Sequence, residues 1–320
     1  MDNALAALAA QQAGIILRTQ ALDAGYSDGE IARCVARGVW VRVRRGAYAE
    51  RRTWEALDEV GRHRARAHAV VRQLAVPAVP SHVTAAVLLR LPVWDADLSA
   101  VHVTRADLHT PRIEGGVHHH AGAIEQSELT GSDDGLVVTA DARTAVDVAR
   151  TLPFESAVVT TDAALARGNV PADGLLVVLD RMRDWRGARA AGRVVEFADG
   201  RSESVGESRH RVQLERIGLP RPELQVTVED RSGETDRVDF YFERFATVGE
   251  FDGREKYQRL LRPGETPGDA MWREKRREDR LRERGLQVVR PVWADLCRDD
   301  VVAARYRQAF ARARGRRAVR

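Results

Sequence analysis

The stretch VDFYFERFATVGEFDGREKY, residues 238–257, places carboxylates where strands ordinarily carry apolar or uncharged side chains. Its apolar residues form two strand-like runs that are separated by a short polar break. Asp239 lies inside the first run, and Glu250 and Asp252 lie at the end of the second. Acidic residues are poor strand formers, and burying a carboxylate costs free energy unless it is paired or binds a metal. The stretch therefore indicates a chemical site built on two strands.

The residues around this stretch predict an α-β-β-β-α-β order of elements. The first helix is amphipathic and is closed by Gly218 and Pro220, and the second is long, charged and closed by Gly285. The expected ranges are helix 202–220, strands 222–230, 233–243 and 245–253, helix 268–285 and strand 286–293. This order is the core of restriction-endonuclease-like nucleases of the PD-(D/E)XK type. It gives the C-terminal part of an α+β multidomain fold, over residues 201–297.

The acidic residues suit the chemistry of such a core. Phosphodiester hydrolysis needs a divalent cation to activate water and to neutralise charge in the transition state. Mg²⁺ takes oxygen ligands in octahedral geometry, and an Asp and a Glu near the point where two strands diverge can share the ion. Asp239 and Glu250 are therefore predicted to bind Mg²⁺ or Mn²⁺, with the carbonyl of Phe251 as a third ligand. Glu207, one turn into the first helix, is predicted to face the same pocket.

This part of the chain also resembles a known family. The segments EFDGREKY, GRSESVGES and REKRREDRLRERGLQVVRPVWADL resemble the DUF559 family, relatives of the Vsr mismatch endonucleases, over residues 200–296. The resemblance implies that Asp239 and Glu250 are the metal ligands and that Glu207 is the helix acid. The lysine that the wider superfamily carries two residues after the Glu falls at Asp252. The water-activating group is thus unassigned, with Lys256 as a candidate and Asp252 as a further ligand.

Two classes of function stay open for this unit. The first is a Mg²⁺-dependent endodeoxyribonuclease that a separate DNA-binding domain delivers to its substrate. The second is a DNA-binding regulator whose degenerate nuclease fold serves as a binding platform. In that case Asp239 would pair with Arg237 or Arg254, and Glu250 would pair with Lys256. The complete set of carboxylates favours the nuclease.

Residues 1–50 predict a winged helix-turn-helix. Ser27 followed by Glu30 forms a capping box for a third short helix, and Gly38 is placed to end it. WVRVRRGAYAE, residues 40–50, alternates apolar residues and arginines around a glycine turn, as a basic hairpin does. In a winged helix the third helix enters the major groove and the wing lies near phosphates. The predicted DNA-binding residues are Arg33, Arg37, Arg42, Arg44 and Arg45. A small helical subdomain for protein contact is the alternative.

The N-terminal segment resembles a second family. GYSDGEIARCVARGVWVRVRRGAYA has a helix ending in R-G and a basic wing ending in R-G-x-Y, and it resembles the N-terminal domain of AbiEi antitoxins of type IV toxin–antitoxin systems. The resemblance covers about fifty residues. It implies a transcriptional autorepressor that binds operator DNA. Double-stranded DNA is the expected partner, and a cognate toxin or another protein is a second one.

Residues 51–175 predict an α/β middle domain, which resembles the region that follows the winged helix in AbiEi-like proteins. Residues 176–200 are expected to be a helical linker, broken at Gly192 and Gly200, and residues 298–320 a basic helix or tail. The expected middle elements are helices 51–74, 80–94, 141–153 and 154–168, and strands 98–105, 116–124 and 135–140.

Most of the histidines fall in this middle domain, at His82, His102, His109, His118, His119 and His120. Successive side chains of a strand point to opposite faces, so of the three adjacent histidines only His118 and His120 can share a face. We therefore expect a surface or interface patch in preference to a metal site.

Composition sets the outer limits. The chain has 320 residues, 44% of them hydrophobic, with a net charge of +4 and a pI near 9.4. The last twenty residues carry seven arginines and no acid, which suits a polyanionic partner. Cys34 and Cys297 lie far apart and form neither a disulfide framework nor a metal motif. The sequence shows no signal peptide and no apolar run long enough for a membrane span, so we expect a soluble, cytoplasmic protein.

Overall fold

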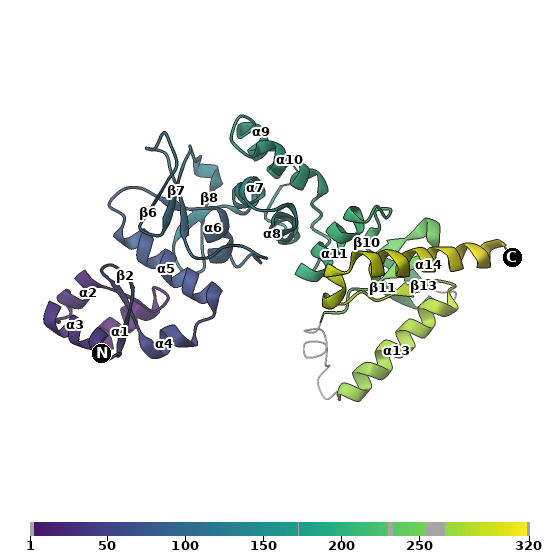
Figure 1. The fold of residues 1–320 in the computed structure, drawn as a ribbon, viewed down its shortest axis with the longest axis horizontal. Coiled ribbons are helices and arrows are strands. Elements are labelled where there is room, and N and C mark those ends of the chain that lie inside the picture. Colours follow the sequence, from purple (N-terminus) through teal and green to yellow (C-terminus); the bar gives the residue numbers. More distant parts are fainter. Residues whose placement is uncertain (1–2, 172, 230–232, 254–265, 319–320) are drawn as a thin grey trace. The chain divides into compact units, whose positions relative to one another are not determined.

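The computed structural model describes residues 3–171, 173–229, 233–253 and 266–318, and it has the α+β multidomain architecture that the sequence predicts. The chain divides into two compact units, residues 1–198 and 199–320 (Figure 1). The first unit holds the predicted winged helix and the middle domain. The second holds the strands on which the acidic residues lie.

Three short helices and a three-stranded antiparallel sheet make up the first fifty residues. The elements are α1 (Asn3–Ala10), β1 (Ile15–Leu17), α2 (Arg18–Asp23), α3 (Asp28–Ala36), β2 (Trp40–Arg44) and β3 (Ala47–Glu50). The sheet order is β1-β3-β2. The helices and the hairpin are confirmed, whereas strand β1 is an addition. Its three residues are all buried, so they lack the alternation that marks a half-exposed strand.

Local sequence determines where the third helix begins and ends. The hydroxyl of Ser27 accepts the N–H of Glu30 at 3.3 Å, and the Glu30 carboxylate accepts the N–H of Ser27 at 2.8 Å. The predicted capping box is therefore confirmed. Gly38 follows the helix with φ of 71°, a conformation that glycine adopts without steric cost. The guanidinium of Arg51 then donates to the Gly38 carbonyl at 2.7 Å and ties the helix end to the chain beyond the wing.

The winged-helix sheet is covered on both faces. One face packs on the three short helices through a cluster that includes Leu5, Ile16, Ile31, Trp40 and Tyr48. The other face packs on α5 (Glu59–Gln73) through a cluster that includes Ile15, Leu17, Ala47, Ala65 and Ala69. If only one face of this sheet were covered, the other face would be free to contact DNA. Here helix α5 occupies the second face.

The middle domain surrounds a four-stranded sheet of order β4-β5-β7-β6, in which β5 and β7 run parallel. A two-stranded ribbon, β8-β9, forms a separate sheet and contacts β4 through β9. The strands are β4 (Val79–Pro80), β5 (Val101–Arg105), β6 (Arg112–Glu114), β7 (Val117–Ala121), β8 (Leu129–Gly131) and β9 (Val137–Thr139). The helices are α4 (Arg51–Ala56), α6 (His82–Leu88), α7 (Asp141–Thr151), α8 (Phe154–Ala166), α9 (Gly174–Arg181) and α10 (Ala188–Phe197).

Two expectations for this region are wrong. The helix expected over residues 51–74 is two helices, because Asp58 accepts the N–H of Gly61 at 2.7 Å and caps the start of α5. Gly192 does not interrupt a helix, since α10 continues through it. The segment 176–200, expected to be a helical linker, is largely helical: it holds α10 and all but the first two residues of α9, and these helices contact α7. Its residues thus contribute to the packed first unit.

The second unit has the predicted α-β-β-β-α-β order, followed by one more helix. Its elements are α11 (Val205–Arg216), β10 (Glu223–Glu229), β11 (Thr235–Phe242), β12 (Thr247–Gly249), α13 (Pro267–Glu283), β13 (Gln287–Val289) and α14 (Asp299–Ala318). The sheet order is β10-β11-β12-β13, antiparallel except for the parallel pair β12-β13.

The basic C-terminal helix belongs to the core of this unit. Tyr306 and Phe310 of α14 are buried against Phe240 and Phe242 of β11 and Leu214 of α11. A second cluster, which includes Leu281 of α13, packs on the same strands. The segment expected to be a basic helix or tail is thus a packed helix, and Arg305, Arg307, Arg312 and Arg314 are exposed. The sequence does not reveal that this helix packs in the core, because its net amphipathicity is very low.

Candidate DNA-binding surface and carboxylate cluster

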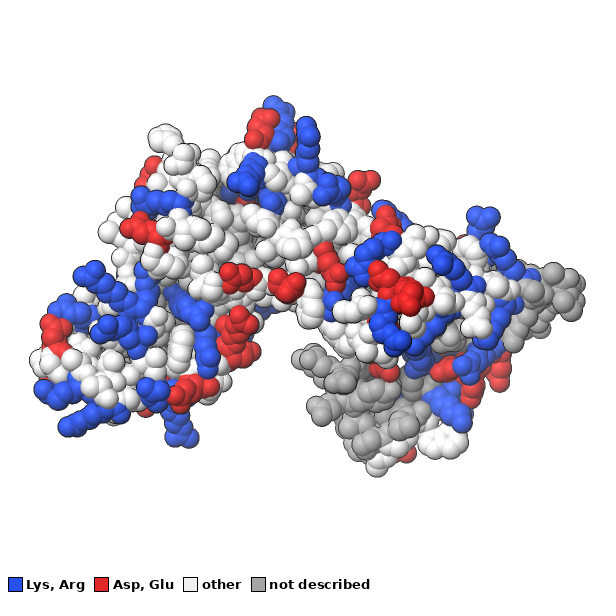
Figure 2. All heavy atoms as spheres, viewed as in Figure 1, with Lys and Arg blue, Asp and Glu red and all other residues white. Residues whose placement is uncertain are grey.

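Positive charge is concentrated around the third helix and the wing. Residues 33–52 contain seven arginines and a single acid, Glu50. Figure 2 shows basic side chains gathered over the N-terminal part of the chain. The first turn of α3 is instead acidic, with Asp28 and Glu30. The basic surface therefore lies at the C-terminal end of the helix and along the wing.

Four of the five predicted DNA-binding arginines lie on this surface. Arg33 and Arg37 are exposed at the end of α3, and Arg42 and Arg45 are exposed on the wing. Arg33 has a loose contact to Glu30, with the guanidinium and carboxylate 3.9 Å apart. Such an exposed pair is worth little, so the guanidinium can turn to a phosphate at low cost.

Arg44, the fifth, occupies a different environment. Its side chain is half-buried, and its Nη1 atom is buried without a hydrogen-bond partner among the described residues. Burial lowers the pKa of Arg44 below the usual value for arginine. The Nη2 atom lies 3.8 Å from the position that a Cβ on Gly115 would occupy, at the β6-β7 hairpin. Arg44 therefore differs from the other four arginines in lying against the middle domain, and its contact with DNA stays a prediction.

The predicted acidic residues meet where two strands of the second unit diverge. The pairing of β11 with β12 ends at Phe240 and Gly249, so Asp239 and Glu250 are the next residues along the two strands. The Asp239 carboxylate accepts the N–H of Phe251 at 2.9 Å. The structure therefore brings Asp239 next to residues 250 and 251, as the sequence predicts.

Glu250 is already neutralised. It is 5% exposed, and Arg277 of α13 donates to both of its oxygens, at 2.5 and 3.3 Å. Arg290 approaches the same carboxylate at 3.2 Å. Lys256, which the sequence offered as a partner of Glu250, lies outside the described residues. The arginines escaped prediction because they are 27 and 40 residues away in the chain.

Glu207 has several hydrogen-bond donors. Its Oε2 atom accepts the N–H of Glu203 and the side-chain amide of Gln225, each at 3.0 Å. Its Oε1 atom accepts the hydroxyl of Ser204 at 2.8 Å, and that hydroxyl also caps the start of α11. Glu207 is 3% exposed. In this structure the helix acid thus stabilises the beginning of its own helix.

Gln225 joins the helix acid to the strand acid. The register of β10 on β11 places Gln225 opposite Asp239, while its side chain donates to Glu207. Its backbone has φ of 54°, which is uncommon for a residue other than glycine and costs conformational energy. Sequence reasoning missed Gln225, because an uncharged residue inside a strand gave no signal.

A glycine allows the helix to approach the acidic strand end. A Cβ on Gly206 would lie 2.1 Å from the ring of Phe251, far inside van der Waals contact. Helix α11 can therefore pack this closely only with glycine beside Glu207. Gln225 donates to Glu207 and lies opposite Asp239 in the register, and Phe251, which follows Glu250 in the chain, donates to Asp239. The convergence of Glu207, Asp239 and Glu250 on one ion stays a prediction.

The remaining acidic residues of this region have their own partners. Arg237, considered as a partner of Asp239, instead pairs with Glu203 at 2.6 Å, and Arg254 lies outside the described residues. Asp252 is half-buried, and its N–H donates to the carbonyl of Pro291 at 2.9 Å. The backbone contact places Asp252 beside the chain that follows β13.

Asp236 is a second buried acid that sequence reasoning did not single out. Arg280 donates to both of its oxygens, at 2.7 and 3.1 Å, and Arg284 lies 3.0 Å away. Burial by itself would raise the pKa of Asp236, but the hydrogen bonds and charges of these arginines outweigh it and hold the pKa below its usual value. The charged face of α13 is therefore an ion-pair interface with the sheet.

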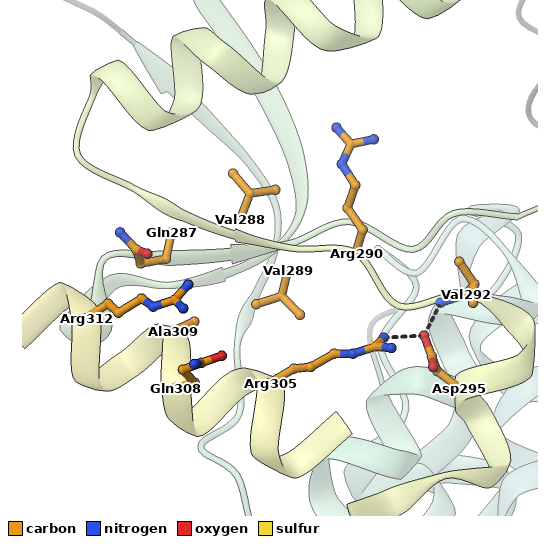
Figure 3. A pocket seen from close by; sticks show the side chains of 10 residues that line it. All are labelled: Gln287, Val288, Val289, Arg290, Val292, Asp295, Arg305, Gln308, Ala309 and Arg312. Atoms are coloured by element: carbon orange, nitrogen blue, oxygen red, sulfur yellow. Dashed lines mark hydrogen bonds and ion pairs between the residues drawn. The ribbon is translucent and has the colours of Figure 1, made fainter. Parts of the chain in front are cut away.

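A cavity of about 480 Å³ opens between β13 and α14 (Figure 3). Arg305 and Arg312 line it from α14, and Arg305 donates to Asp295 at 2.7 Å. Arg290 follows directly after β13 and points away from Arg305 and Arg312 in Figure 3, and it contacts Glu250.

The histidines of the middle domain differ in exposure: His109 is exposed, and His102, His118 and His120 are partly buried. His82 is 2% exposed and His119 is 4% exposed, so for these two residues the expectation is wrong. His82, His102 and His120 lie together, and His118 stacks on His102 with ring centroids 4.5 Å apart. The sequence could not show this cluster, because the three residues belong to a helix and two strands that meet only in the folded chain.

Comparison with known proteins begins with the N-terminal segment. Residues 3–51 match the family described as "Transcriptional regulator, AbiEi antitoxin". Two proteins of Mycobacterium tuberculosis, "Uncharacterized protein Rv2248" of strain H37Rv and "Uncharacterized protein MT2308" of strain CDC 1551, are each 36% identical over 199 residues. The aligned region is 62% of this chain and 69% of theirs. This chain belongs to their family.

One solved structure is also similar in part. The RV2827C protein of Mycobacterium tuberculosis aligns with a TM-score of 0.41 and 14% identity, over 71% of this chain and 87% of its own. A likeness of that size does not establish a shared fold.

The family match at residues 3–51 supports a role in DNA binding for the winged helix. No helix in the described part of this chain is both long enough and apolar enough to cross a membrane.

Proposed function

We propose that this protein is a DNA-binding transcriptional regulator of the AbiEi antitoxin type. The observation that supports it most is the basic surface formed by Arg33 and Arg37 on α3 and by Arg42 and Arg45 on the wing, within the segment that matches this family. Arginine suits phosphate because its planar fork makes two parallel hydrogen bonds. A helix end and a wing that carry such groups can contact neighbouring phosphates of one duplex.

The shape of the N-terminal domain supports this role. Helix α3 leaves Gly29, Ala32 and Ala36 exposed beside its arginines, so these three positions carry no bulky side chain. The sheet that carries the wing is held between the three helices and α5, which keeps Arg42 and Arg45 in place relative to α3. A preorganised surface of this kind loses little conformational entropy when it binds.

The double variant Arg42→Ala/Arg45→Ala tests this function. Binding of the full chain to duplex DNA is expected to weaken on every sequence, and the slope of log K against log salt is expected to fall by about two, roughly one for each lost phosphate contact. Fluorescence anisotropy at several salt concentrations measures both quantities.

Arg44→Ala and Arg90→Ala provide matched controls for the double variant. Arg44 is half-buried against the middle domain, and Arg90 is exposed but pairs with Asp133 at 2.8 Å, outside the N-terminal domain. Neither change should reduce the salt slope. An unchanged affinity and slope in Arg42→Ala/Arg45→Ala would contradict DNA binding through the wing and would favour a protein-binding role for this domain.

In this proposal the second unit is a binding platform for a protein partner, such as a cognate toxin. Its buried acids already have cationic or hydrogen-bonding partners: Arg277 and Arg290 surround Glu250, and a helix cap and Gln225 engage Glu207. A metal ion at these carboxylates would have to compete with those guanidiniums. Such an arrangement suits a nuclease-like fold that has kept its stability and lost its ion.

A Mg²⁺- or Mn²⁺-dependent endonuclease is the second candidate function. The observation that favours it is the position of Asp239 and Glu250 at the point where β11 and β12 diverge, within an α-β-β-β-α-β order. Asp239 accepts the backbone N–H of Phe251. The residues present suit a hard cation: Asp239, Glu250 and Glu207 would hold it, and it would activate a water molecule and neutralise charge on the phosphate.

A cleavage assay separates the two functions. We expect the full chain to leave plasmid, mismatched, flapped and single-stranded DNA intact in Mg²⁺ or Mn²⁺, since the regulator needs no cleavage. Cleavage that appears with either metal, disappears with chelator and is abolished by Asp239→Ala would establish the nuclease instead. Glu203→Ala is the matched control, because Glu203 is an exposed acid of the same region. DNA binding should be the same in all these variants, because it depends on the N-terminal arginines.

A further inference from the structure

Three histidines from separate elements meet in the middle domain. His82 is the first residue of α6, His102 lies in β5 and His120 lies in β7. One ring nitrogen from each lies within 4.8 Å of those of the other two. In the part of the chain that the structure describes, they are the group of three whose ligand atoms lie close enough to hold one ion.

The sheet brings two of these rings together. Strands β5 and β7 are parallel neighbours, and their register pairs His102 with His118. His120 lies two residues farther along β7 and therefore on the same face as His118. His102 Nδ1 lies 3.0 Å from His120 Nε2. His119 points to the opposite face, where it is buried.

The ring distances are compatible with one ion after a small rotation. The centroids of His102 and His120 lie 5.1 Å apart, and those of His82 and His102 lie 5.9 Å apart. Two imidazoles on a tetrahedral zinc ion, with Zn–N near 2.0 Å, have centroids about 5 Å apart. His82 and His120 are stacked at 3.7 Å, so one of these two rings must turn for both to face the ion. The second side-chain torsion of histidine is broad, which permits this turn.

The hydrogen bonding of His82 differs from that of a histidine with a purely structural role. Buried His63 has both ring nitrogens engaged, one with the Leu98 carbonyl at 2.8 Å and the other with the Thr84 hydroxyl at 2.9 Å. In contrast, His82 Nε2 is buried without a hydrogen bond among the described residues. His82 also has φ of 53°, a strained conformation for a residue that carries a Cβ. Strain and an unsatisfied buried nitrogen are costs that a ligand would offset.

We propose that His82, His102 and His120 bind one divalent transition-metal ion of the zinc class. Three imidazole nitrogens are a ligand set that suits such ions and leaves a fourth position open. His102 and His120 are only partly buried, so an ion can reach them from solvent. The proposal is independent of the DNA-binding function, since it concerns a different part of the first unit.

The surroundings keep the three rings in the form that a metal needs. Burial, together with the charge of His120, lowers the pKa of His102 to about 3. Burial, together with the charge of His82, lowers the pKa of His120 to about 3. Neutral imidazoles offer a lone pair to a metal. The carboxylate of Asp147 lies 3.7 Å from His82 Nε2, and the hydroxyl of Ser81 lies 2.9 Å from His82 Nδ1. Whichever of the two nitrogens binds the ion, the other has a partner that can orient the ring.

The charges near the site are balanced. Asp147 is completely buried and is bound by Arg143 at 2.9 Å and by Arg150 at 3.0 Å. The two arginines would otherwise repel a cation, and the carboxylate offsets part of their charge. A bound ion would join the beginning of α6 to β5 and β7, three segments that are held together in the sheet and its covering helix. Metal binding should therefore stabilise the middle domain.

The test uses the untagged full chain with Zn²⁺ and Co²⁺ as probes. Isothermal titration calorimetry should show one Zn²⁺ bound per chain. Co²⁺ should give the visible absorption of a nitrogen-ligated, four- or five-coordinate ion, and Zn²⁺ should remove it. His102→Gln should weaken Zn²⁺ binding by more than the roughly tenfold to hundredfold that loss of an outer-shell partner causes. His120→Gln should do the same.

Two variants make this experiment specific. His109→Gln removes an exposed histidine outside the cluster and should leave Zn²⁺ affinity unchanged. His118→Gln should change it less than His102→Gln does, because His118 is not one of the three converging ligands. Circular dichroism checks that each variant is folded. A wild-type chain that binds no Zn²⁺, or a His102→Gln/His120→Gln chain that binds it as tightly as wild type, would overturn the proposal. The wild-type titration tests the proposal even where a variant fails to fold.

Discussion

Glu250→Ala is expected to destabilise the second unit by about 3 kcal/mol. Removing one member of a buried ion pair leaves the other charge without compensation, at a cost of roughly 3–5 kcal/mol. Arg277 and Arg290 both approach Glu250 and keep about a quarter of their side-chain surface exposed, 25% and 26%. Water can therefore solvate them in part, which favours the lower end of that range.

Whether Glu250→Ala destabilises or stabilises the second unit distinguishes two roles for Glu250. A carboxylate whose main role is to bind a metal is repelled by its acidic neighbours in the metal-free protein, so its removal would be neutral or stabilising. A carboxylate that neutralises two guanidiniums stabilises the protein without any metal. Urea unfolding in chelator, with hydrogen exchange to assign the transition to β11 and β12, measures the change.

Glu203→Ala is the control for this measurement. Glu203 pairs with Arg237 at 2.6 Å, but both side chains are about half exposed, 49% and 55%. Exposed pairs of this kind contribute at most about 1 kcal/mol. If Glu250→Ala were as stable as wild type in chelator, Glu250 would not be the structural partner of the arginines, and the nuclease would become the better candidate.

Trp40→Ala is expected to destabilise the N-terminal domain by about 3–5 kcal/mol and to weaken DNA binding with it. Deletion of a large buried aromatic side chain removes its transfer free energy and leaves a cavity. Trp40 is 2% exposed, and its ring lies 5.3 Å from that of Tyr26 and 6.0 Å from that of Tyr48. It begins the strand that carries the wing, so its loss should disturb both α3 and the arginines that follow.

Thermal unfolding and DNA titration of the same sample check this prediction. The melting temperature should fall, and DNA affinity should fall most at temperatures near the new transition. Val39→Ala is the neighbouring control, since Val39 is 50% exposed and contributes little to the core. DNA binding that is unchanged while the N-terminal domain unfolds would show that the affinity resides elsewhere in the chain.

Local patterns in the sequence predicted several elements correctly. Ser27 and Glu30 lie three residues apart, and the capping box they form depends on little beyond that spacing. The hairpin of β2 and β3 and the α-β-β-β-α-β order follow from apolar periodicity and from glycines at the breaks. These features depend on contacts between residues that are near in the chain, so a single sequence contains most of the information.

Contacts between distant residues were not predictable in the same way. Arg44 is one of several wing arginines in the sequence, and only the packing of the wing on the middle domain buries it. Because α14 has low amphipathicity, the sequence does not show that its Tyr306 and Phe310 complete the core of the second unit. Strand β1 shows no alternation because both of its faces are covered. In each case the deciding neighbour lies far along the chain.

The sequence alone predicts which charged residues lie on which local element. It places arginines on a short helix and its wing, and acids at the ends of two strands. Which of these charges meet depends on the folded chain. Folding pairs Glu250 with Arg277 and Arg290, and it assembles His82, His102 and His120 from a helix and two strands. The physical reason is distance along the chain. A side chain's environment depends on which segments pack against it, and a pattern within one segment carries no information about the charge of another.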